Sequence, residues 1–430
     1  MSEKNNKALK NRSVGYFKYL IIVLILVQIL DNYTSFYNSV IPSKVVEDLL
    51  SGYPDNVANS IFAICVAIAS LGTYMAFFVW YAADRIGRRF LLITTTFSLA
   101  VASIGILFSR NIAEYTIFFF MLNIFAASDM WLIYVNEEAP TKKKSFWTSI
   151  VLIGGSIGAV LNPLFRSIFV SETSPVGSWR GMTYFAIFLA IPLTILILFT
   201  VKETSRYQEV KQNQYKVKER VQKFRENLKV IFKSERRIPY SVILFVGFIW
   251  GLNAIYTSLG ELFLASSPYL NEQEINLVIT IMSLAIIIGY LITATMADKL
   301  GRKPLMINYN LLFFIGTIIL IIGIQNSELA LIMTIIGTSI MNISFWGLWV
   351  LISIVTIETL PTDSRATGVG LKNLMKALGI TVGLLIANVI IYFSSLAILF
   401  LIYSILFLIN APLIYKYIIE TKGIDLSAVK

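Results

Sequence analysis

The stretch Asp84-Arg85-Ile86-Gly87-Arg88-Arg89 recurs, little changed, as Asp298-Lys299-Leu300-Gly301-Arg302-Lys303, half the length of the 430-residue chain later. Both copies follow the pattern Asp-[Arg/Lys]-x-Gly-Arg-[Arg/Lys], and each lies between two long apolar runs. A segment with so many charges can hardly enter hydrocarbon. The repetition therefore predicts a duplicated bundle of membrane helices, with a basic turn at the same place in each half.

The composition supports a chain that lies in a bilayer. Apolar residues make up 57% of the sequence and charged residues 14%, and the mean hydropathy is +0.73, more apolar than an ordinary soluble domain. A net charge of +11 would suggest nucleic-acid binding in a soluble protein. Here the positive side chains gather in short loops, as the orientation rule for membrane helices predicts. We therefore expect no nucleic-acid partner.

Several kinds of chemistry are excluded by the residues that the sequence lacks. It contains no histidine and one cysteine, Cys65, within an apolar stretch. Neither a disulfide framework nor a Cys/His metal site is available, and the usual near-neutral proton carrier is missing. No nucleophile elbow or phosphate-binding loop occurs. We expect no catalytic residues, no metal, no cofactor and no enzymatic activity, so proton chemistry must use carboxylates.

Twelve apolar segments reach the length of about 20 residues that a helix needs to cross a bilayer. Basic residues occupy every second loop, which places both termini in the cytoplasm. The predicted fold is all-α, with two six-helix bundles at 18–201 and 239–417 and cytoplasmic tails at 1–17 and 418–430. The expected spans are 18–41, 59–82, 90–109, 114–136, 146–170, 180–201, 240–264, 274–297, 305–324, 328–357, 367–393 and 396–417.

A long polar segment, 202–238, separates the two sets of spans and carries twelve Lys/Arg against five Glu. Val217, Val221, Phe224 and Phe232 recur there at helical spacing together with Leu228, which predicts an amphipathic helix at the cytoplasmic interface. A connector is the favoured interpretation, and a partner-binding or regulatory segment is the alternative.

Short motifs of charged and small residues lie near the ends of the predicted spans. They are Tyr134-Val135-Asn136-Glu137-Glu138-Ala139-Pro140, Ser178-Trp179-Arg180, Glu203-Thr204-Ser205-Arg206-Tyr207, Glu358-Thr359-Leu360-Pro361-Thr362, Arg365-Ala366-Thr367-Gly368 and Glu420-Thr421-Lys422-Gly423. In this order, and with the repeated basic turn as the signature loop, they resemble the major facilitator superfamily and, within it, the sugar porter family. The resemblance implies a monomeric plasma-membrane transporter of twelve helices that alternates between two openings around a mid-membrane site.

The same resemblance implies a cytoplasmic gate of charged residues. Arg-carboxylate pairs are directional enough to bind and weak enough in water to break, as a gate requires. The alternative is that these residues only cap helix ends and enforce topology. The expected gate residues are Asp84, Arg85, Arg88, Arg89, Glu137, Glu203, Arg206, Asp298, Arg302, Glu358, Arg365 and Glu420.

Proton coupling is assigned to carboxylates within the spans. Asp31 lies thirteen residues after Lys18, about 20 Å along a helix and so near mid-membrane. Proton-coupled sugar porters tend to carry an aspartate in this helix; a helix-helix hydrogen bond is the alternative role of Asp31. Asp129, in the fourth span, is a second candidate and is expected to pair with Lys376 when the cytoplasmic side is closed. Alternatively, Lys376 extends to the headgroups.

Other polar and aromatic residues of the spans suit a small polar solute, although packing or interfacial anchoring is the alternative for each. The family's glutamines are missing: Leu152 stands in the fifth span, and the box in the seventh reads Gly247-Phe248-Ile249-Trp250-Gly251, which argues against a standard hexose. The candidate solute ligands are Asn32, Tyr33, Asn38, Asn162, Asn253, Tyr256, Trp346, Trp349, Asn373 and Lys376.

Proton-coupled uptake of a sugar-like or other small polar solute is the favoured function. The first alternative is a symporter of organic anions, for which Lys376 or Arg166 would supply charge, or an exporter. A nutrient sensor that no longer transports is less favoured, because such sensors tend to carry a long cytoplasmic tail and few residues follow the last span.

Overall fold

The computed structural model describes residues 14–75, 79, 86–126, 130–139, 144–204, 226–360 and 365–422. Within these ranges no residue lies in a strand, and twelve helices are long and apolar enough to cross a membrane. The prediction of an all-α chain with twelve membrane helices is confirmed.

One compact unit combines residues 1–38, 71–165 and 180–216. Its helix α6 packs against α10 and α7, and α2 packs against the same two helices. The helices of this unit are α2 (Val14–Phe36), α6 (Arg88–Leu107), α7 (Ile112–Ala126), α8 (Met130–Glu138), α10 (Met182–Thr200) and most of α9 (Lys144–Phe169).

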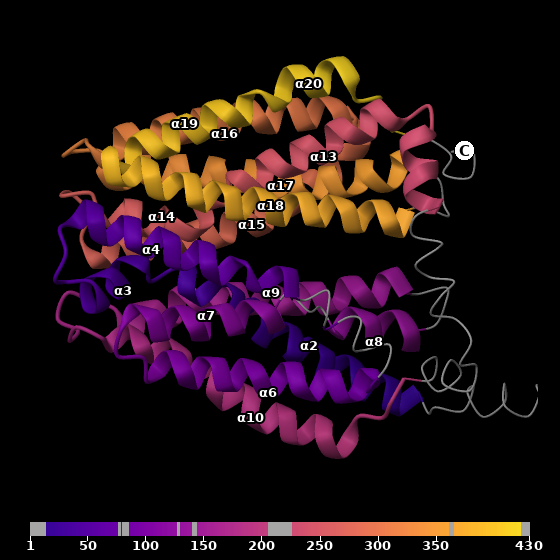
Figure 1. Ribbon diagram of the computed structural model, residues 1–430, viewed down its shortest axis with the longest axis horizontal. Coiled ribbons are helices and arrows are strands. Elements are labelled where there is room, and N and C mark those ends of the chain that lie inside the picture. The colour runs from indigo at the N-terminus through magenta and orange to yellow at the C-terminus, as the bar shows by residue number, and fades with distance from the viewer. Residues whose placement is uncertain are drawn as a thin grey trace, which may run out of the picture. The chain divides into compact units, whose positions relative to one another are not determined.

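A second compact unit combines residues 39–70, 166–179 and 217–430. Its helix α17 packs against α15 and α16, and α18 lies along α13 and also contacts α4 (Figure 1). The helices of this unit are α3 (Pro42–Leu49), α4 (Asp55–Ser70), α13 (Arg237–Leu252), α14 (Ile255–Ala265), α15 (Glu272–Leu300), α16 (Arg302–Ile324), α17 (Ala330–Thr359), α18 (Arg365–Phe393), α19 (Leu396–Leu408) and α20 (Asn410–Tyr417).

The helix ends differ from the predicted spans by a few residues. α2 ends at Phe36, before a 3-10 turn at Tyr37–Ser39, and Pro42 opens α3, where proline is favoured because the first helical residue needs no N–H. α4 begins at Asp55 rather than at residue 59, since an acidic first turn suits a helix N-terminus. The predicted bundle boundaries and the amphipathic linker helix stay predictions; residues 226–233 of the linker are helical, and 205–225 lie outside the described residues.

A glycine makes the turn in each copy of the repeated charged segment. Gly87 precedes α6 with φ 121°, and Gly301 precedes α16 with φ 101°. Side chains rarely tolerate this region of backbone space. At Gly301 a Cβ atom would also lie 2.5 Å from Oε2 of Glu420. The glycine of the repeated pattern is therefore required by the turn that starts each following helix.

Candidate functional site

The first charged network surrounds the N-terminus of α6. The Glu203 carboxylate accepts hydrogen bonds from the backbone N–H groups of Arg88, at 3.0 Å, and Arg89, at 3.2 Å, where a helix favours negative charge. The Arg88 side chain pairs with Glu137 at 3.3 Å. Thr204 donates its hydroxyl to the other oxygen of Glu137 at 2.5 Å. One arginine, two glutamates and a threonine thus join the ends of several helices.

The second network repeats this arrangement at the N-terminus of α16. Glu420 accepts from the backbone N–H groups of Arg302, at 2.9 Å, and Lys303, at 3.1 Å. The Arg302 side chain pairs with Glu358 at 3.3 Å, and Thr421 donates to Glu358 at 2.5 Å. Each residue of the second network makes the same kind of contact as its counterpart in the first, so the sequence duplication extends to the hydrogen bonds.

Electrostatics at Glu420 follow from this geometry. Burial raises the pKa of the Glu420 carboxyl, but the backbone N–H donors of Arg302, Lys422 and Lys303 outweigh it. The pKa therefore lies below its ordinary value, and the carboxylate stays charged where it caps α16.

The structure brings together most of the predicted gate residues. Arg88, Arg89, Glu137 and Glu203 meet in one network. In the other, Asp298 contacts Arg302 at 2.9 Å, beside Glu358 and Glu420. Their gating role stays a prediction. Asp84, Arg85 and Arg206, and the side chain of Arg365, lie outside the described residues. Sequence reasoning missed Thr204 and Thr421, although the repeated Glu-Thr pair could have revealed them.

Asp31 lies in the C-terminal half of α2 and is partly buried. It lines a small cavity with Thr95 and Thr96 of α6 and with Trp131 of α8. The lining is completed by apolar side chains, those of Val27, Leu99, Phe125 and Met130, and the proton-carrying role of Asp31 stays a prediction. The other proton candidate, Asp129, lies outside the described residues, so its pairing with Lys376 stays a prediction.

Several predicted solute ligands form hydrogen bonds within the protein. The hydroxyl of Tyr33 donates to the Met182 carbonyl at 2.7 Å, and Asn38 accepts from the Tyr115 hydroxyl at 2.9 Å. Tyr256 bonds Asn342, a residue that the sequence did not single out. The amides of three further asparagines donate to a carbonyl four residues earlier in their own helix: Asn32, Asn162 and Asn253.

Two lysines and a tryptophan form a cluster between α18 and α17. The Lys372 ammonium donates to Ser353 Oγ at 2.8 Å and lies 4.0 Å from the centroid of the Trp349 ring. Lys376 Nζ lies 4.9 Å from the same ring. Asn373 is exposed, because adjacent helical residues point about 100° apart. We name Lys372, Lys376, Trp349 and Ser353 the lysine-tryptophan cluster.

Trp250 of α13 packs against the tryptophan of this cluster. Its ring lies 4.6 Å from that of Trp349 and is stacked on Phe345 at 4.2 Å, and its indole N–H donates to the Phe345 carbonyl at 2.7 Å. Trp346 meets Trp250 edge-on at 5.8 Å. The structure thus brings together the predicted residues Trp346, Trp349 and Lys376, and adds Lys372, Ser353 and Trp250.

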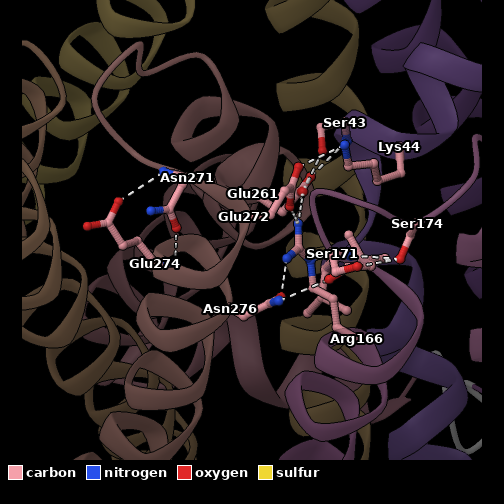
Figure 2. Close-up of polar contacts among 12 residues, drawn as sticks. Ser43, Lys44, Arg166, Ser171, Ser174, Glu261, Asn271, Glu272, Glu274 and Asn276 are labelled. Atoms are coloured by element: carbon pink, nitrogen blue, oxygen red, sulfur yellow. Dashed lines mark hydrogen bonds and ion pairs between the residues drawn. The ribbon is translucent and has the colours of Figure 1, made fainter.

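A third polar network surrounds Arg166, in the last turn of α9 (Figure 2). Its Nη2 lies 2.6 Å from Glu261 and 3.2 Å from Glu272. Nε donates to the Val40 carbonyl at 2.6 Å, and Nη1 donates to Asn276. Because all three guanidinium nitrogens donate to protein acceptors, Arg166 is engaged in structure rather than offered to a solute.

Ser43 and Lys44 of α3 complete this network. Ser43 donates its backbone N–H and its hydroxyl to Glu261, at 2.8 and 2.5 Å. Lys44 Nζ lies 2.7 Å from Glu272 and 2.9 Å from Glu47. Burial lowers the pKa of Lys44, but the hydrogen bonds with Glu272 and Glu47 outweigh it, so the pKa lies above its ordinary value.

Comparison with known protein families identifies the family of this chain. The family model of the Major Facilitator Superfamily matches residues 21–266 and 249–424. The chain belongs to the major facilitator superfamily. The superfamily prediction is confirmed, and the protein is a multi-pass membrane protein. Membership of a transporter family fits the expectation that the chain is not an enzyme.

Curated members of the superfamily resemble the chain over much of its length. One, from Bacillus subtilis (strain 168), has a name that assigns it provisionally to metabolite transport; it is 23% identical over 81% of each chain. The arabinose-proton symporter of Escherichia coli (strain K12) is 25% identical over 57% of this chain and 56% of its own length. The cis,cis-muconate transport protein of Acinetobacter baylyi is 23% identical over 52% and 53%.

Solved structures show the same fold. A D-xylose-proton symporter superimposes with a TM-score of 0.79 at 17% identity, over 95% of this chain and 99% of that one. The nucleoside transporter NupG gives 0.72 at 14% identity, over 92% and 99%. The family match and the curated relatives make the protein a secondary active transporter of small organic solutes.

Proposed function

We propose that this transporter couples the uptake of a small polar, sugar-like solute to proton movement, with Asp31 as the proton-carrying group. The observation that carries the proposal is a partly buried carboxylate in a membrane helix, beside a small cavity that two threonines, Thr95 and Thr96, line together with mostly apolar side chains. Ionisable groups at such depth are costly and mark ion pathways. Since the chain has no histidine, a carboxylate is the group suited to the task.

The relatives support the same chemistry. The arabinose symporter of Escherichia coli is proton-coupled by name, and a second relative, from Staphylococcus epidermidis, is named a glucose transporter and is 30% identical over 34% of this chain and 31% of its own length. We further propose a plasma-membrane location with both termini cytoplasmic, on the distribution of basic loops.

Proteoliposomes test the coupling. Purified protein is reconstituted, and accumulation of a radiolabelled solute is measured with and without an inward proton gradient. We expect Asp31→Asn to lose gradient-driven accumulation while keeping exchange of labelled for unlabelled solute. Asp55→Asn, at the exposed start of α4, is the control and should accumulate normally. Accumulation by Asp31→Asn at the normal level, or wild-type uptake that ignores the gradient, would exclude this role.

A further inference from the structure

Lys372 is a buried cation that the protein leaves incompletely compensated. Its exposed fraction is 3%. Among the described residues, no carboxylate forms an ion pair with it, and Ser353 is the hydrogen-bond partner of its ammonium. An ammonium has three donors, and burying a charge without an opposite charge is costly. This position therefore favours an acceptor that carries negative charge.

The positive charge of Lys376 increases the preference of this position for an anion. Lys376 lies one helical turn further along α18, and both ammonium groups approach the ring of Trp349, at 4.0 and 4.9 Å. Like charges at this spacing repel each other. The face of an indole ring compensates a cation in part, by about 0.5–2 kcal/mol. An anion that accepts from Lys372 would reduce this repulsion and complete the hydrogen bonding of its ammonium, for which Ser353 is the partner among the described residues.

The surroundings of the cluster suit a small organic molecule. Lys372 is buried, whereas Trp349, Ser353 and Lys376 are partly exposed, so part of the cluster lies at the surface of its unit. Trp349 rests on Trp250, which is held by its own hydrogen bond. A rigid aromatic surface beside a positive charge binds a molecule with an apolar or ring-shaped body and an acidic group.

We propose that the lysine-tryptophan cluster binds the carboxylate of the transported solute, so that the protein transports a small organic acid rather than a neutral sugar. This assignment rests on the transport function proposed above and names its solute class. It also accounts for the box at 247–251, in which Trp250 stands among residues that offer no side-chain amide. A sugar acid satisfies both the sugar-like expectation and the charge of this cluster.

Binding measured by calorimetry on the detergent-purified chain tests the proposal without any gradient. The probes are two matched pairs, D-glucuronate with D-glucose and benzoate with benzyl alcohol. We expect at least one carboxylate to bind more than tenfold more tightly than its neutral partner. Lys372→Met and Lys376→Met should each weaken that binding by roughly 10- to 100-fold, the value of a charge-assisted hydrogen bond. Lys372→Arg, which keeps the charge, should lose less.

Lys416→Met is the matched control, because Lys416 also lies over an aromatic ring, 5.1 Å from the centroid of Tyr417, but is exposed. It should bind like the wild type. If Lys372→Met does not fold, as judged by its melting curve, Lys376→Met decides. Equal binding of the neutral partners, no binding of either carboxylate, or carboxylate binding that survives the lysine variants overturns the assignment. Carboxylate binding together with uptake that ignores a proton gradient overturns only the coupling to Asp31.

Discussion

Arg166 and Glu261 form a buried ion pair, with 2.6 Å between Nη2 and Oε1 and side-chain exposed fractions of 0% and 1%. The pair joins the last turn of α9 to α14, and Glu272, Asn276 and the Val40 carbonyl accept from three further guanidinium donors. A buried pair is tolerated when its other hydrogen-bonding groups are satisfied in this way. Removing the charge of Arg166 or Glu261 would therefore leave a buried charge that is only partly compensated.

Removing the charge of Glu261 should destabilise the protein strongly. We expect Glu261→Gln to cost about 3–5 kcal/mol, because Arg166 would keep a buried charge with Glu272 as its remaining carboxylate partner. Thermal unfolding of the detergent-purified chain measures the effect. The control is Glu274→Gln, which changes a partly exposed carboxylate that caps α15 through Asn271 and should cost about 1 kcal/mol or less. Equal melting temperatures for the two variants would contradict the prediction.

We expect the stability of the two charged networks to depend on the hydroxyl groups of Thr204 and Thr421. We expect Thr421→Val to lower stability by roughly 1–3 kcal/mol, since one oxygen of Glu358 would lose its donor. Thr421→Ser keeps the hydroxyl and should retain most of the stability. Thr204→Val and Thr204→Ser repeat the test at Glu137 in the other network. Melting curves of the four variants decide it: a serine variant as unstable as its valine partner would show that the methyl group matters instead.

The acid stability of the protein should depend on Glu420. Its pKa in the folded chain is lowered, so its contribution is present above the ordinary carboxyl pKa and is lost as the pH falls through the lowered value. Glu420→Gln removes that contribution. The melting temperature of the wild type, measured from pH 7 to pH 3, should fall toward that of the variant as the solution becomes more acidic. A difference between the two that stays constant over this range would show that Glu420 does not titrate in the folding reaction.

A structural feature can be predicted from the sequence when the residues that determine it lie close together in the chain. Long apolar segments and basic turns predict twelve spans, because charges avoid hydrocarbon wherever they stand in the fold. The partners of Arg166 are different: Glu261 and Glu272 lie about a hundred residues away, and no local pattern links them. Asn38 and Tyr256 illustrate the second limit. A polar residue within a span either faces a cavity or bonds another helix, and its sequence position does not distinguish the two.

Close contact between α13 and α18 should limit residue size at Gly379. A Cβ atom there would lie 2.1 Å from the Phe248 carbonyl oxygen, whereas a Cβ atom at Gly370, on the same helix, would meet nothing within 4 Å. Gly379→Ala should therefore separate the helices and lower stability by about 1–3 kcal/mol. Gly370→Ala removes backbone freedom without a clash and should be neutral or stabilising by up to about 1 kcal/mol. The melting temperatures of the two variants measure this difference.

The same contact should affect solute binding, because α18 carries Lys372 and Lys376. Gly379→Ala should weaken the binding of a carboxylate that the wild type binds, and Gly370→Ala should not. Equal effects of the two alanines on both measurements would mean that the contact between α13 and α18 is looser than the structure shows.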